Sequence, residues 1–63
     1  MSNTFLIGEK VCWSIGREDN PILLRGLYIE KTNSTESKVL CYEQNGQRRN
    51  IELKVLTELL KRD

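Results

Sequence analysis

Turn-forming residues recur along this chain at short, fairly regular intervals, and this spacing constrains the fold more than any other feature. The breaks fall at Gly8-Glu9, at residues 16–21, at residues 31–37 and at Asn45-Gly46. Apolar and polar residues alternate between the breaks, as at Val11, Trp13 and Ile15, and a period of two is typical of a half-buried strand. Short strands separated by turns at this spacing indicate an all-β fold.

The pattern predicts four strands before the last segment, over residues 10–15, 22–30, 38–43 and 47–53. Asn45-Gly46 is the strongest hairpin signal, because a two-residue type I′ turn needs positive φ at both positions. Gly26 lies in the middle of the second strand and predicts a bulge or a sharp bend there.

The segment after residue 53 fits two structures. Four apolar residues would share one face if the segment were a helix, namely Val55, Leu56, Leu59 and Leu60. The alternative is a single helical turn at residues 54–56, followed by a short closing strand at residues 58–61. We favour the second, because four strongly bent strands leave an edge that needs to be closed.

Size and charge narrow the classes of function. The 63 residues predict a single domain over residues 1–63. A domain of this size buries only about 60% of the surface of its unfolded chain, so little structure remains for a catalytic cavity. The net charge is +1, from ten Lys plus Arg and nine Asp plus Glu. Because nucleic-acid-binding domains usually carry a marked basic excess, any such role must depend on a local patch.

The chain contains no histidine and two cysteines, Cys12 and Cys41. The missing histidine removes the commonest general base, the Ser-His and Cys-His nucleophile pairs and most zinc sites. We therefore expect no catalytic residue, no metal site, no cofactor and no enzymatic activity. The cysteines fit two small core thiols, and a single disulfide in an oxidising compartment is the alternative.

The N-terminal segment carries only three consecutive apolar residues, Phe5, Leu6 and Ile7, and no basic leader. A secretory signal needs an apolar stretch of about 7–15 residues, and a membrane span needs about 20. We expect a cytoplasmic protein with reduced thiols and no membrane partner.

A family resemblance covers nearly the whole chain. The residues that carry it are Gly8-Glu9-Lys10-Val11-Cys12-Trp13, Leu24-Arg25-Gly26-Leu27-Tyr28-Ile29-Glu30, Val39-Leu40-Cys41-Tyr42, Asn45-Gly46 and Ile51-Glu52-Leu53-Lys54-Val55-Leu56. In this order the chain resembles an SH3-like barrel of the Tudor type. The resemblance implies a mainly β, five-stranded barrel with a short C-terminal helical turn.

Five residues are candidate contacts with a partner. Arg48 and Arg49 form a local basic pair directly after the Asn-Gly turn, and Arg25 on the second strand is expected to line the same sheet face. Tyr28 and Tyr42 have polar tips that suit a partner groove, or stacking on a base beside phosphate contacts. The alternative is a solvated hairpin whose charges keep the sheet soluble. Trp13, on an alternating strand, is expected in the core.

We expect a non-catalytic binding module. The first hypothesis is protein–protein interaction, including self-association, because a small domain gains stability when it buries a face on a copy of itself. The alternative is a nucleic-acid-associated module that uses the basic and aromatic sheet face. A third hypothesis is an accessory enzyme subunit whose site forms only across an oligomer pore.

Overall fold

A computed structural model describes residues 5–63, which form one antiparallel sheet of five strands. The elements are β1 (Lys10–Arg17), β2 (Asn20–Lys31), β3 (Glu36–Gln44), β4 (Gln47–Leu56), the 3₁₀ turn η1 (Thr57–Leu59) and β5 (Lys61–Arg62). This confirms the mainly β fold and its five strands. The alternative of a long C-terminal helix is wrong, because η1 is only three residues long. No helix among residues 5–63 is long and apolar enough to cross a membrane.

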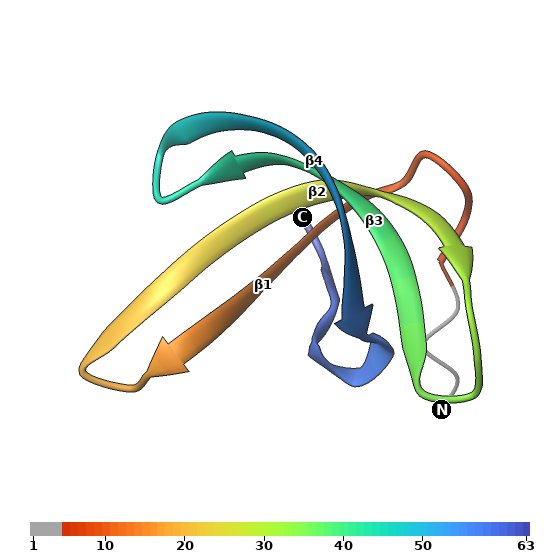
Figure 1. The fold of residues 1–63 in the computed structure, drawn as a ribbon, viewed down its shortest axis with the longest axis horizontal. Helices are drawn as coiled ribbons and strands as arrows, with labels where there is room; N and C mark the ends of the chain where they lie inside the picture. Colours follow the sequence, from red (N-terminus) through yellow and green to blue (C-terminus); the bar gives the residue numbers. More distant parts are fainter. Residues whose placement is uncertain (1–4) are drawn as a thin grey trace.

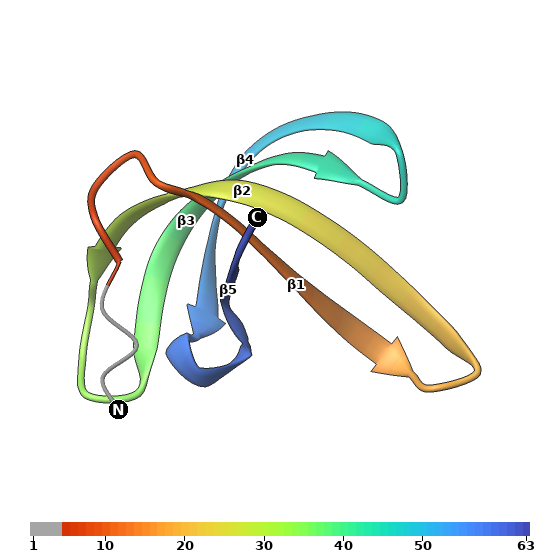
Figure 2. The same cartoon turned by 180° about the vertical axis from the view of Figure 1, so that it is seen from behind.

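The strands follow the order β4-β3-β2-β1-β5 across the sheet. Figure 1 shows a strongly bent sheet, in which the tips of the β1–β2 and β3–β4 hairpins project toward the same side. Seen from behind, β5 lies beside β1 (Figure 2), with which it pairs. Within residues 5–63 the end strands β4 and β5 do not pair with each other, so the sheet is open.

One of the two irregularities in the pairing of β2 with β3 lies at Gly26, and the other lies between Tyr28 and Glu30. The pairing of β2 with β3 shifts register between Arg25 and Gly26, and the pairing of β3 with β4 shifts between Cys41 and Glu43. A Cβ atom on Gly26 would lie 2.7 Å from the backbone oxygen of Leu40. Because no larger residue fits at that distance, the glycine allows the two backbones to approach. The predicted bulge is therefore confirmed.

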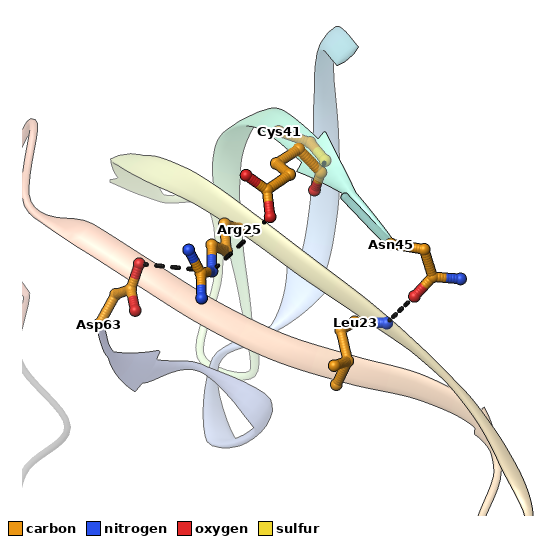
Figure 3. Close-up of polar contacts among 6 residues, drawn as sticks. Leu23, Arg25, Cys41, Asn45 and Asp63 are labelled. Atoms are coloured by element: carbon orange, nitrogen blue, oxygen red, sulfur yellow. Dashed lines mark hydrogen bonds and ion pairs between the residues drawn. The ribbon is translucent and has the colours of Figure 1, made fainter. Parts of the chain in front are cut away.

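The β3–β4 turn is also as predicted. Asn45 and Gly46 have φ values of 49° and 83°, and Gln44 pairs with Gln47, which defines a two-residue hairpin loop. Asn45 additionally binds the neighbouring strand: its backbone N–H donates to Leu23 O at 2.8 Å, and its Oδ1 accepts from Leu23 N at 2.8 Å. Figure 3 shows the side-chain bond. The turn is thus held against β2.

The core lies on one side of the bent sheet. Its buried members are Phe5, Val11, Trp13, Leu24, Tyr28, Val39, Cys41, Val55 and Leu60. Trp13 is 5% exposed, which confirms its expected place in the core. The cysteines are free thiols, Cys12 half-buried and Cys41 buried. They lie on opposite faces, because Cys41 pairs with Gly26 and Gly26 with Val11, the neighbour of Cys12.

The C-terminal segment turns later than the sequence predicts. The helical turn occupies Thr57–Leu59 instead of residues 54–56, and the last strand covers Lys61–Arg62 instead of residues 58–61. The reason is that β4 keeps its pairing with β3 as far as Leu56, which lies opposite Glu36. Val55 is buried there and holds the strand extended.

The two ends of the described chain are joined. The guanidinium of Arg62 lies 5.0 Å from the ring centroid of Phe5, and its Nε is 2.7 Å from Glu9 Oε2. The rings of Phe5 and Tyr28 are 5.5 Å apart. Residues 1–4, which belong to the segment that lacks a signal-peptide pattern, lie outside the described residues.

Candidate functional site

A groove of about 460 Å³ crosses the sheet from the η1–β5 segment, over β1 and β2, to the β3–β4 turn. It is lined by Cys12, Trp13, Ser14, Leu23, Leu24, Arg25, Glu43, Asn45, Gly46, Glu58, Leu59, Lys61 and Asp63. Its volume lies within the range of ligand-binding clefts, roughly 300–1,000 Å³. We refer to it below as the groove.

Two leucines of the groove are exposed. Leu23 on β2 is 60% exposed and Leu59 on η1 is 38% exposed. The buried cluster of residues 5–63 contains neither of them. They therefore present apolar surface in a concavity, where burial by a partner would be favourable.

Charged side chains of both signs line the same groove. Arg25 Nε lies 3.9 Å from Glu43 Oε2 and 3.8 Å from Asp63 Oδ2. Figure 3 shows Arg25 and Asp63 turned toward each other. These separations are long for ion pairs, and the Arg25 side chain is 53% exposed, so the pairs contribute little to stability. Glu58 and Lys61 complete the set. Three carboxylates thus stand against two cations, although the whole chain has a net charge of +1.

One strand edge beside the groove has no partner. β5 pairs only with Val11 and Cys12 of β1 before the chain turns away at Leu60. Among residues 5–63, the remainder of β1, residues 13–17, pairs with β2 alone. Trp13 and Ser14 belong to both this edge and the groove. The unpaired N–H and C=O groups can accept an additional extended segment.

The five predicted partner contacts do not gather on one surface. Tyr28 is 7% exposed, packs against Phe5 and has its hydroxyl 3.4 Å from Ser37 Oγ, so its side chain belongs to the core. Tyr42 is half-buried and lies in the bulged stretch between Cys41 and Glu43. The ring of Tyr28 therefore offers no exposed face on which a base could stack.

The three predicted arginines are exposed, and two of them share a face. Arg25 lines the groove between two carboxylates. Arg48 and Arg49 lie on the projecting first half of β4, with Arg48 directly opposite Glu43 of β3. Arg25 and Arg48 share a face, because both are paired with Glu43. The basic pair is therefore a feature of β4 and lies outside the groove lining.

Sequence reasoning missed the groove residues Leu23, Asn45 and Leu59. The sequence does contain a signal for Leu23. Along β2, Leu23 lies an odd number of residues from Gly26, which faces the core, so the Leu23 side chain is expected on the opposite face. Asn45 was recognised only as a turn former, and its bond to β2 depends on which strand the hairpin folds against. The sequence predicts Leu59 either in a closing strand over residues 58–61, which is favoured, or on an apolar helical face. Its exposed place on η1 follows only from the direction of the chain after Leu56.

Neither a search for metal ligands nor comparisons with known proteins assign a function to the groove. Residues 5–63 contain no group of three or more His, Cys, Asp or Glu side chains that could hold a metal ion. Comparisons of the chain with protein-family models, with curated proteins and with solved structures find no match. The groove and the strand edges are therefore interpreted from their own chemistry.

Proposed function

We propose that this chain is a non-catalytic protein-interaction module that binds an extended, basic peptide segment of a partner protein in the groove. The observation that carries the proposal is the pair of exposed leucines, Leu23 and Leu59, in a groove beside an unpaired strand edge. The edge supplies main-chain hydrogen bonds, and the leucines supply apolar contact, which is the division of roles in strand addition.

The charge of the groove favours a basic occupant. Glu43, Glu58 and Asp63 outnumber Arg25 and Lys61, and Arg25 already faces two of the carboxylates. An occupant with Lys or Arg side chains would therefore meet complementary charge, which raises association rates and fixes register. The absence of histidine from the whole chain supports a binding role over acid–base catalysis.

We also propose that the fold is a variant of the SH3-like barrel of the Tudor type. The support is the long, bent second strand with its central glycine, the tight β3–β4 hairpin and the 3₁₀ turn before a last short strand. In this variant β5 is only two residues long, so part of the β1 edge is left for a ligand.

The proposal is tested by NMR titration with a synthetic octapeptide of alternating lysine and valine. We expect amide shifts concentrated at residues 13–17 and along the groove, and none with the matching glutamate–valine peptide. Leu23→Ala and Leu59→Ala should each weaken binding by up to roughly tenfold, since each removes apolar surface that the peptide would bury. Leu56→Ala is the matched control, because Leu56 is 43% exposed and lies outside the groove lining.

Two results would overturn the proposal. One is the absence of any groove shift with the basic peptide. The other is a set of shifts at Arg48 and Arg49 with single-stranded oligonucleotide, steeply weakened by salt, which would favour the nucleic-acid alternative. The nucleic-acid alternative is included in the test because Arg48 and Arg49 are both exposed on β4.

A further inference from the structure

The first half of β4 is a long, exposed edge that carries charged side chains. β4 is an end strand of the sheet, and among residues 5–63 it pairs only with β3. Residues 47–52 are all exposed, whereas Leu53 and Val55 are half-buried and buried. The strand contains neither Pro nor Gly, which are common ways of blocking such an edge. At the other end of the sheet, β5 is only two residues long, and the open edge beside it, residues 13–17 of β1, adjoins the groove.

Side chains of opposite charge alternate with neutral ones along one face of this edge. Arg48 lies opposite Glu43 of β3, and alternation along the strand places Asn50 and Glu52 on the same face as Arg48. Arg49 and Ile51 occupy the other face, and Ile51 is 41% exposed. A basic and an acidic residue therefore flank Asn50 at equal distances along the strand.

We propose that two copies of the chain pair through β4, antiparallel and centred on Asn50. A two-fold axis perpendicular to the sheet at Asn50 places Arg48 of each copy directly opposite Glu52 of the other, and it brings the two Asn50 amides together. On the opposite face, Ile51 of each copy meets the aliphatic stem of Arg49. The two sheets then form one continuous sheet.

Neighbouring registers fit this edge less well. Centring on Ile51 sets Arg48 against Lys54, and centring on Glu52 sets the two Glu52 side chains against each other. A register centred on Leu53 does match Glu52 with Lys54, but it uses the half of the strand in which Val55 is already buried in the core. The Asn50 register uses only residues 47–53, most of which are exposed.

This inference concerns a surface outside the groove lining and does not depend on peptide binding there. The contact is small, so the dimer is weak and depends on protein concentration. It is measured by sedimentation equilibrium of the full chain over a range of concentrations. Arg48→Glu and Glu52→Arg each place like charges opposite each other twice, and each should raise the dissociation constant by roughly tenfold.

The decisive arm mixes the two variants in equal amounts. In the Asn50 register each variant complements the other, so the mixture should form heterodimers with an affinity near that of the wild type. Arg17→Glu and Glu18→Arg are the matched controls, since they make the same charge changes at the exposed tip of the β1–β2 hairpin. Circular dichroism on thermal unfolding shows that each variant is folded.

The possible outcomes either support the pairing or exclude it. Concentration-dependent dimerisation that is lost in both variants and restored on mixing supports it. A chain that stays monomeric at every concentration overturns it, as does a dimer that neither variant weakens. A dimer disrupted by Lys54→Glu but not by Arg48→Glu replaces it with the Leu53 register.

Discussion

Gly26 is the residue on which the curvature of the sheet depends. We expect Gly26→Ala to lower the free energy of unfolding by roughly 1–3 kcal/mol or more, because the new Cβ would overlap the Leu40 carbonyl and force the β2 and β3 backbones apart. The distance available is 2.7 Å, and the obstacle is backbone, which has no alternative rotamer. Urea denaturation monitored by Trp13 fluorescence measures the change.

Gly46 provides the control for this substitution. Its φ is 83°, but a Cβ at this position would have no atom within 4 Å. Gly46→Asn should therefore cost less than about 1 kcal/mol, because Asn tolerates positive φ. Equal losses at the two glycines would show that the close approach at Leu40 is not what Gly26 provides.

A buried hydroxyl pair fastens the 3₁₀ turn to the sheet. Ser37 is fully buried, and its Oγ lies 2.6 Å from Thr57 Oγ1. Thr57 is half-buried and can turn to water, whereas Ser37 retains only the long 3.4 Å contact with Tyr28 Oη if its partner is removed. We expect Thr57→Val to lower the free energy of unfolding by roughly 1–3 kcal/mol.

A double-mutant cycle isolates this contribution. Adding Ser37→Ala to Thr57→Val removes the hydroxyl left without its close partner, so the double variant should be no less stable than Thr57→Val alone. Additive losses in chemical denaturation would mean that packing at η1, and not the hydroxyl pair, determines the effect.

At the scale of elements, the β3–β4 ladder contains an unfavourable cross-strand pair. Lys38 lies directly opposite Lys54, and on its other side it faces Glu30 of β2. Lys54→Glu would replace a repulsive pair with an attractive one. The free energy of unfolding should therefore rise by roughly 0.2–1 kcal/mol, and the gain should shrink with added salt.

The matched change at Glu58 separates pairing from net charge. Lys54→Glu makes the net charge two units more negative. Glu58→Lys changes it by the same amount in the opposite sense, on an exposed residue of η1 that has no strand partner. Only the change at Lys54 should alter stability measurably in thermal unfolding. A Lys54→Glu variant that is less stable than the wild type would contradict the cross-strand reading.

The elements differ in how far the sequence predicts them. The hairpin at Asn45-Gly46 and the bulge at Gly26 follow from local backbone chemistry, because few residues adopt positive φ or allow two backbones to meet. The end of β4 cannot be predicted from local chemistry, because its extension to Leu56 depends on pairing with Glu36, which is far away in the chain. The helical turn was therefore placed three residues too early.

The candidate site was harder to predict than the fold. Tyrosine is a residue type that is common in binding sites. Tyr28, however, lies on the same face of β2 as Leu24 and Gly26, and that face is buried in the core. The groove depends on β5 being short, and its leucines come from strands and turns that meet only in three dimensions. The periodicity of a strand predicts which face of the sheet a side chain lies on, but it does not predict which other segment of the chain covers that face.

For the molecule as a whole, the two proposed surfaces are compatible. The groove lies across β1, β2 and the η1–β5 segment, whereas the self-pairing edge is the outer side of β4. A dimer formed through β4 would thus carry two grooves, and a partner with two basic segments could bind both. Such bivalent binding is stronger than either contact alone, provided that the linker between the segments spans the dimer.

The connectivity of the strands also has a kinetic consequence. β1 to β4 form a meander whose ladders close short loops, whereas the two residue pairs between β1 and β5 join opposite ends of the chain. Loop closure of that length is entropically expensive, so β5 is expected to dock last and to fray first. Each fraying event releases Val11 and Cys12 from their second partner. The edge open to an incoming strand then extends along all of β1, and affinity for a ligand becomes coupled to the opening equilibrium of a two-residue strand.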